Sequence, residues 1–198
     1  MTDKTPPFIL ASQSPRRKEL LKKLEIKFEV YPSNIEETLD NYQKPEIIAE
    51  DLSRQKANDV AIHFPDKIVI GADTIVVIDH EILGKPTDHA HAVKMLRRLS
   101  GRTHEVYTGV TLVRLSRNAE FSFSERTEVT FHTLSTEEIN AYVKSNPPLD
   151  KAGGYGIQDW EAKFVDTFSG CRDNVIGFPL QKFNDYITSS VFSDTFGL

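Results

Sequence analysis

A long apolar run from Ile68 to Ile78 constrains the fold of this 198-residue chain more than any other feature. Its content of Ile and Val is typical of a strand buried inside a sheet. Strand-like and helical patterns alternate ahead of it: strands near residues 8–11 and 27–31, and helices over about Pro15–Leu24 and Pro45–His63. This alternation predicts an α/β fold with a buried sheet.

The rest of the chain continues the pattern. We expect a short hairpin strand at Glu81–Leu83, helices over Asp88–Leu99, from Ser135 and over Pro179–Thr188, antiparallel strands at Val106–Arg114 and Phe121–His132, and a strand at Ala162–Phe168. No linker-like stretch interrupts the sequence. Residues 1–198 are therefore predicted to form a single α/β domain, built as one body or as two lobes that share a sheet.

Charge and composition exclude several classes of protein. The net charge of −5 argues against a general nucleic-acid or membrane-surface binder, which would normally carry a basic excess. The single cysteine, Cys171, rules out an intramolecular disulfide and a cysteine-based zinc site. No stretch resembles a signal peptide or approaches the ~20 apolar residues of a membrane helix. These features predict a cytoplasmic protein.

The segment Ser14-Pro15-Arg16-Arg17 predicts a helix start that could hold an anion. Ser14 suits the N-cap and Pro15 the first helical position. Arg16 and Arg17 then lie at the positive end of the helix dipole, where cations are disfavoured unless an anion such as a phosphate chain binds there. The alternative is a solvated basic surface.

Two charged residues fall where the pattern is apolar. Asp73 interrupts the buried run, and Lys56 lies within the apolar stripe of the helix that begins at Pro45. A buried carboxylate needs a cation, a metal ion or a raised pKa, as is typical of functional sites. Asp73 could instead be structural, and Lys56 could extend its ammonium to solvent. Taken together, the two opposite charges could share one site.

Three further signals are weaker. Glu36-Glu37 follows the second strand and could reach a metal ion, although paired surface acids are common. Lys85 lies in the turn Gly84-Lys85-Pro86, which could reach a phosphate but is not a P-loop. The glycine-rich loop that ends at Gln158 could let backbone approach a ligand and place an amide on a base edge, or it could be a plain turn.

In this order, the motifs resemble those of the Maf family of nucleoside triphosphate pyrophosphatases, from Ile9 to about Pro179. The matching segments are Leu10–Leu21, Gly71–Thr74, Leu83–Pro86, Met95–Gly101 and Lys151–Gln158. The resemblance implies a Maf/ITPase-like α/β fold, with two lobes around a long mixed, twisted sheet, flanking helices and a cleft between the lobes. It also implies hydrolysis of a nucleoside triphosphate to the monophosphate and pyrophosphate with a divalent metal, Mg²⁺ or Mn²⁺.

Residue roles follow from the resemblance by motif position. Asp73 would be the general base that activates water, and Glu36 would contact the metal. The substrate would be held by Ser12, Arg16, Arg17, Lys56, Thr74, Lys85 and Gln158. The form Tyr155-Gly-Ile-Gln158 is similar to the branch that acts on dTTP and UTP, in which Arg16, Thr74 and Gln158 match the specificity positions.

The segment Gly170-Cys171-Arg172-Asp173-Asn174 departs from the usual family pattern, as does Phe178, where Leu is usual. This departure concerns the local wall of the expected cleft more than the catalysis. The expected partners are a nucleoside triphosphate, with no nucleic acid or membrane, and a homodimer is compatible with the resemblance. The expected role is house-cleaning of the nucleotide pool, with modified pyrimidine nucleotides among the candidate substrates. The alternative is a non-enzymatic nucleotide sensor linked to cell division.

Overall fold

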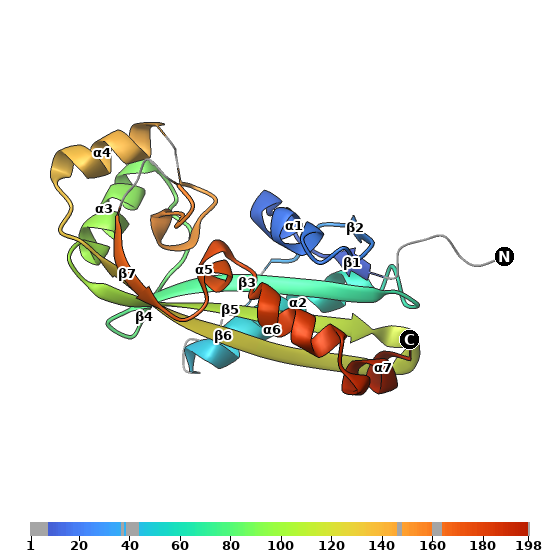
Figure 1. The fold of residues 1–198 in the computed structure, drawn as a ribbon. Helices are drawn as coiled ribbons and strands as arrows, with labels where there is room; N and C mark the ends of the chain where they lie inside the picture. Colours follow the sequence, from blue (N-terminus) through green and yellow to red (C-terminus); the bar gives the residue numbers. More distant parts are fainter. Residues whose placement is uncertain (1–7, 37, 39–43, 146–147, 160–163, 198) are drawn as a thin grey trace. The chain divides into compact units, whose positions relative to one another are not determined.

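The computed structural model describes residues 8–36, 38, 44–145, 148–159 and 164–197 (Figure 1). The chain forms two compact units. Unit 1 comprises the described residues up to Asp73, Thr108–Ser124 and the residues from Gly177 onward, and unit 2 comprises Thr74–Tyr107 and Glu125–Ile176.

A seven-stranded mixed sheet, in the order β2-β1-β3-β5-β6-β7 with β4 paired to β3, confirms the predicted fold class. Strand β1 is parallel to β2 and β3, whereas β4 is antiparallel to β3 and β7 is antiparallel to β6. The strands are β1 (Phe8–Leu10), β2 (Phe28–Val30), β3 (Ile68–Ile78), β4 (Glu81–Leu83), β5 (Thr103–Arg114), β6 (Ala119–Phe131) and β7 (Val165–Ser169). The long strands β3, β5 and β6 contribute residues to both units.

The helices are α1 (Pro15–Lys22), α2 (Pro45–Ala61), α3 (His89–Leu99), α4 (Thr136–Ser145), α5 (Arg172–Ile176), α6 (Leu180–Ile187) and α7 (Ser190–Phe196), with 3₁₀ turns η1 (Leu115–Arg117) and η2 (Ala152–Gly154). The sequence did not predict α5 and α7, which are too short to show helical periodicity. None of the described helices combines the length and the apolarity needed to cross a membrane.

In unit 1, helix α2 packs unusually close to the sheet. Its small residues Ala49, Ser53 and Ala57 are fully buried. A Cβ atom on Gly71 of β3 would lie 2.1 Å from the Ser53 carbonyl oxygen, and one on Gly109 of β5 would lie 2.1 Å from that of Ala49. The two glycines therefore allow the backbone of α2 to approach the strands directly.

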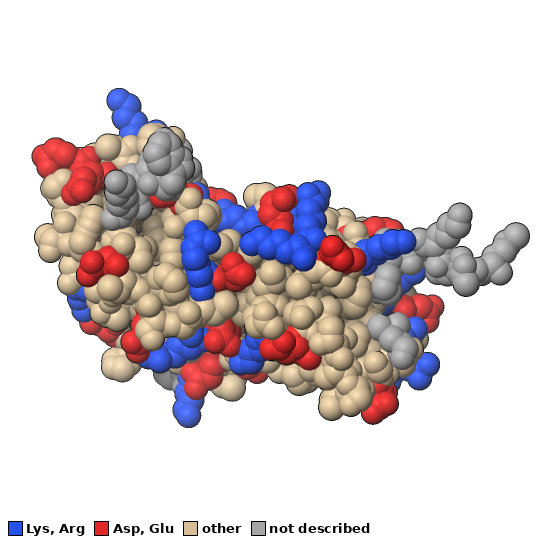
Figure 2. All heavy atoms as spheres, in the orientation of Figure 1, with Lys and Arg blue, Asp and Glu red and all other residues tan. Residues whose placement is uncertain are grey.

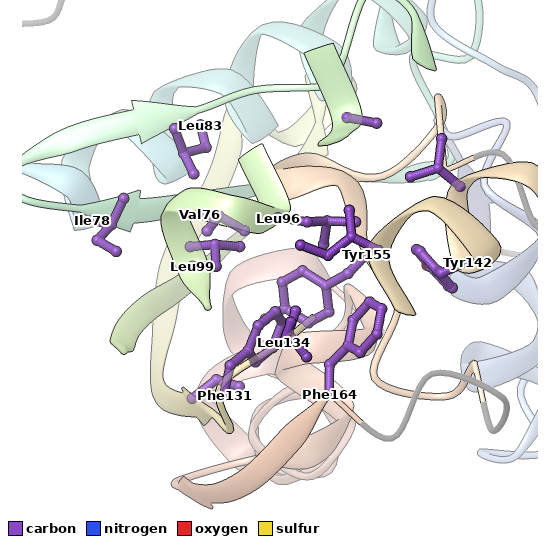
Figure 3. Close-up of a cluster of buried hydrophobic side chains, with 14 of the residues drawn as sticks. Val76, Ile78, Leu83, Leu96, Leu99, Phe131, Leu134, Tyr142, Tyr155 and Phe164 are labelled. Atoms are coloured by element: carbon purple, nitrogen blue, oxygen red, sulfur yellow. The ribbon is translucent and has the colours of Figure 1, made fainter. Parts of the chain in front are cut away.

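Unit 2 has its own apolar core, which includes side chains from β3, β6, α3 and α4 and is shown in Figure 3. Within it, Tyr142 and Phe164 meet edge to face, with ring centroids 4.9 Å apart. Helix α4, which the sequence predicted to start at Ser135, begins with a capping box. The Ser135 N–H donates to Glu138 Oε2 (2.7 Å), and the Glu138 N–H donates to Ser135 Oγ (3.1 Å).

Candidate functional site

In unit 1 the carboxyl ends of the parallel strands converge on one edge of the sheet. Leu10, the last residue of β1, is in register with Val30 of β2 and Ile70 of β3. In the sheet, β1 has β2 as its neighbour on one side and β3 as its neighbour on the other side, so the connections that follow β1 and β2 lead to opposite sides of β1. Such a switch point is where open α/β sheets bind ligands. The segments after β1 and β2 and the continuation of β3 past Ile70 all begin there.

The loop after β1 is organised around the hydroxyl of Ser12, which is buried. Ser12 Oγ accepts hydrogen bonds from the Ser14 N–H (3.2 Å) and from Arg17 Nη1 (3.2 Å). Because both bonds use the oxygen as an acceptor, the hydroxyl proton can donate to an anion. Ser14 caps α1 as predicted, since its Oγ accepts from the Arg17 N–H (3.4 Å).

The first turn of α1 is basic and has no acidic residue. Arg16 and Arg17 are both half-buried, and Arg17 Nε donates to the Gly177 carbonyl oxygen at 2.9 Å. This bond holds the Arg17 guanidinium beside the helix start. Figure 2 shows Lys and Arg side chains gathered over the region where α1 lies in Figure 1. The local charge is therefore suited to an anion although the net charge of the chain is negative.

Asp73 and Lys56 form an ion pair, as the sequence suggested. Along β3, Gly71 faces α2, and the alternation of side chains in a strand points Asp73 to the same face. Each side chain is only 12% exposed. A low-exposure carboxylate fixed by a lysine near the edge where the parallel strands end is suited to orient water, while the ammonium supplies charge for a developing anion.

Glu36 lies on an exposed segment. Residues before and after Glu36 in this segment form hydrogen bonds to α2. Before it, Ser33 Oγ and the Asn34 N–H donate to Asp59 Oδ2, at 2.7 and 3.3 Å. After it, the Thr38 N–H donates to Gln55 Oε1 at 2.9 Å. Gln55 and Asp59 flank Lys56 along the helix. These bonds hold the Glu36 segment along the part of α2 that carries Lys56.

The remaining candidates belong to unit 2. Thr74 follows Asp73 on β3 and is half-buried, and Lys85 is exposed in the turn after β4. The Gly153 N–H donates to the Gly84 carbonyl oxygen at 3.0 Å, which joins the Lys85 turn to the glycine-rich loop that leads to Gln158. Gln158 Oε1 is buried and has no hydrogen-bond partner among the described residues.

A sequence model of one family, described as Maf-like protein, matches residues 7–190. The chain belongs to the Maf family. Two relatives, both named dTTP/UTP pyrophosphatase, support this assignment over most of the chain. The one from Bacillus mycoides (strain KBAB4) is 51% identical over 88% of this chain and 90% of its own length. The one from Bacillus cytotoxicus is 52% identical over 88% of this chain and 91% of its own length.

A solved structure titled as a nucleoside-triphosphatase/dITP/XTP pyrophosphatase, from Mycobacterium abscessus, was also found by structural comparison. It aligns with 64% of this chain and 75% of its own, at 17% identity and a TM-score of 0.43.

The structure of this Maf protein also reveals a polar cluster that the sequence analysis missed. Tyr142 of α4 donates its hydroxyl proton to Asp159 Oδ2 at 2.6 Å, and Lys151 Nζ lies 3.7 Å from the same oxygen. Lys151 and Asp159 are only 10% and 13% exposed. The sequence signal was a lysine at the start of a matched motif. Asp159 directly follows that motif, whereas Tyr142 comes from α4, so spacing alone could not show that the three side chains meet.

Burial sets the protonation of two groups in unit 2. The pKa of Tyr142 is raised far above its usual value, first by burial and then by the hydrogen bond to Asp159, so the phenol remains a donor. Burial lowers the pKa of His104 to about 4, and its Nε2 lies 2.7 Å from the Tyr155 hydroxyl. His104 is therefore neutral at physiological pH.

Proposed function

We propose that this chain hydrolyses dTTP and UTP to the monophosphate and pyrophosphate, with Asp73 as the general base. The observation that carries the proposal is the low-exposure Asp73–Lys56 pair on β3 and α2, in the same unit as the capped, basic start of α1. The two Bacillus relatives carry the name of this activity, and they cover most of the chain at about half identity.

Phosphoryl transfer requires positioning and charge more than covalent chemistry. Asp73 would accept a proton from the attacking water while Lys56 holds its carboxylate in place. Ser12, Arg16 and Arg17 would bind phosphate oxygens through the hydroxyl, the guanidinium groups and the open amides of α1. Lys85 would contribute a further point charge to the triphosphate.

A divalent cation, Mg²⁺ or Mn²⁺, would neutralise charge on the phosphates when bound. Among the described residues no three His, Cys, Asp or Glu side chains group into a metal site. An exposed carboxylate such as Glu36 fits a hard cation that takes most of its ligands from phosphate and water. We therefore propose that Glu36 is the protein contact of this ion.

Base selection is assigned to Gln158, with Arg16 and Thr74 at the other specificity positions. A buried amide oxygen without a donor is costly, and a ligand N–H would satisfy it. Uracil and thymine present N3–H between two carbonyl oxygens, which matches an amide that accepts and donates side by side. The methyl group that distinguishes the two bases is worth only about 1–3 kcal/mol in a pocket.

The test is incubation of the purified chain with each common nucleoside triphosphate and Mg²⁺ or Mn²⁺, with separate assays for pyrophosphate and orthophosphate. We expect pyrophosphate release with dTTP and UTP as preferred substrates. Release of orthophosphate alone, or no turnover of any triphosphate, would contradict the proposal. Binding without turnover would instead support the nucleotide-sensing alternative.

A further inference from the structure

The polar cluster formed by Tyr142, Lys151 and Asp159 surrounds a tight turn that contains Gln158. The turn runs from Gly156 to Asp159 and is closed by a hydrogen bond from the Asp159 N–H to the Gly156 carbonyl oxygen at 3.0 Å. Gln158 is its third residue. Any group that fixes both ends of this turn also fixes the backbone of Gln158.

The Tyr142 hydroxyl contacts both ends of the turn. It accepts a hydrogen bond from the Gly156 N–H at 3.3 Å and donates to Asp159 Oδ2 at 2.6 Å. Tyr142 is itself rigid, because the residue is only 5% exposed and its ring packs edge to face on Phe164. Figure 3 shows Tyr142 and Phe164 in the apolar cluster of unit 2. The turn is thus attached to the core of this unit through one oxygen atom.

The side chain of Gln158 is also confined. A Cβ atom on Gly156 would lie 2.9 Å from Gln158 Nε2 and 2.9 Å from Asp159 Oδ2, so the amide group lies against the bare Cα of the glycine. Gln158 Oε1 is buried and has no hydrogen-bond partner among the described residues. A fixed amide of this kind matters chemically, because rotating it by half a turn exchanges its donor and its acceptor.

We propose that Tyr142 and Asp159 are positioning residues that set base selectivity by holding the turn and the amide of Gln158 in one orientation. The oxygen of the amide is then kept for a ligand N–H, which favours the N3–H of a uracil-type base. Cytosine carries an acceptor at N3 and would need the opposite orientation. Lys151 supports the arrangement by supplying the opposite charge to Asp159. This inference rests on the proposed base-reading role of Gln158.

The test compares binding of α,β-imido-dUTP and α,β-imido-dCTP to the full chain by calorimetry with Mg²⁺ present. Tyr142→Phe removes the hydroxyl and keeps the packed ring. We expect the ratio of the two affinities to fall about threefold to tenfold, which is the loss expected when the neutral hydrogen bond between the Gln158 amide and the base is no longer favoured. A purely structural role would weaken both ligands equally and leave the ratio unchanged.

Asp159 offers a second, independent pair of variants. Asp159→Ala removes the acceptor of the Tyr142 proton and should lower the ratio, whereas Asp159→Asn keeps an acceptor oxygen and should restore much of it. Tyr155→Phe is the matched control, because it deletes a buried tyrosine hydroxyl that is bonded to His104 instead. That control should leave the ratio as in the wild type.

Gln158→Ala separates the two proposals. If the wild type shows no preference, or if Gln158→Ala keeps the preference, both the base-reading role and this inference are wrong. If Gln158→Ala abolishes the preference while Tyr142→Phe and Asp159→Ala keep it, only this inference is wrong. In the Gln158→Ala background, Tyr142→Phe should change the ratio no further.

Discussion

Single charged residues of low exposure lie at the centre of both proposals. In unit 1, Asp73 is paired with Lys56, and in unit 2, Asp159 is paired with Lys151. The free-energy cost of removing water from two charges can exceed the gain from their attraction, so such pairs are weak evidence for stability. Their positions are better explained by function, because one pair joins β3 to α2 and the other lies at the end of the Gln158 turn.

The first prediction concerns Asp73. Asp73→Asn should fold, because the amide oxygen can still accept a hydrogen bond from Lys56. The amide cannot accept the proton of the attacking water, so turnover should fall by at least about a hundredfold. Steady-state kinetics and thermal unfolding measure the two effects separately.

Asp79→Asn provides the control for this variant. Asp79 follows β3, has a half-exposed side chain and pairs with Arg102, and Asn tolerates its positive φ of 53°. Turnover of this variant should match that of the wild type, since exposed ion pairs contribute little. A near-normal rate for Asp73→Asn would remove Asp73 from the role of general base.

The second prediction is a pH dependence of stability that arises from His104. Its pKa falls from 6.5 to about 4 on folding because the ring is buried. Below about pH 6.5 the unfolded chain therefore binds a proton at His104, whereas the folded chain does not bind it until about pH 4. The free energy of unfolding thus decreases as the pH is lowered from about 6.5 to about 4. By about pH 5 this loss should reach roughly 2 kcal/mol.

Urea unfolding of the wild type and of His104→Gln, at neutral pH and at about pH 5, isolates this contribution from that of the carboxylates. Gln retains a polar group for the Tyr155 hydroxyl but does not titrate. The wild type should lose more stability than the variant as the pH falls. Parallel losses in the two proteins would show that His104 does not contribute.

At the scale of elements, the contact between α2 and the sheet determines where Lys56 lies. The third prediction is that Gly71→Ala destabilises the protein by about 1–3 kcal/mol or more, because it overpacks this contact. The new Cβ would lie 2.1 Å from the Ser53 carbonyl oxygen and 2.7 Å from the Ala57 nitrogen. Turnover should fall as well, since α2 carries Lys56.

Gly84→Ala is the matched control for the stability measurement. Apart from the neighbouring residues in the chain, no heavy atom of the described residues would lie within 4 Å of a Cβ on Gly84. Its unfolding midpoint in urea should lie close to that of the wild type. If Gly71→Ala were equally stable, α2 would not be held by this close approach.

Element prediction from the sequence succeeded where periodicity was strong. The buried run became β3, and the helices starting at Pro15 and Pro45 were found with their first residues correct. The strands expected at Val106–Arg114 and Phe121–His132 begin earlier than predicted, at Thr103 and Ala119. Their extra residues lie at strand ends, where polar residues weaken the periodic signal. Residues 162 and 163, the first two of the expected strand Ala162–Phe168, lie outside the described residues.

At the scale of the whole molecule, the long strands β3, β5 and β6 supply residues to two compact units. The Asp73–Lys56 pair and the α1 start belong to unit 1, whereas Lys85 and the Gln158 turn belong to unit 2. The single-domain assignment, the homodimer and the cytoplasmic location stay predictions.

The fourth prediction concerns the metal ion. Chelation of divalent cations should abolish turnover without changing the unfolding midpoint, because the described residues contain no group of three ligating side chains that would hold an ion in the substrate-free protein. Turnover and urea unfolding with and without a chelator test this. A lower midpoint after chelation would indicate a resident structural ion instead.

The sequence by itself determined the α/β class, the capped basic start of α1, and the anomalous charges Asp73 and Lys56, because these depend on local propensity and on hydrophobic period. Only the tertiary structure decided which charges meet. Lys56 reaches Asp73 because Gly71 lets α2 approach β3. Tyr142 reaches Asp159 because α4 packs in the core beside the Gln158 turn. Contacts between distant segments depend on packing in three dimensions, which spacing along the chain does not encode.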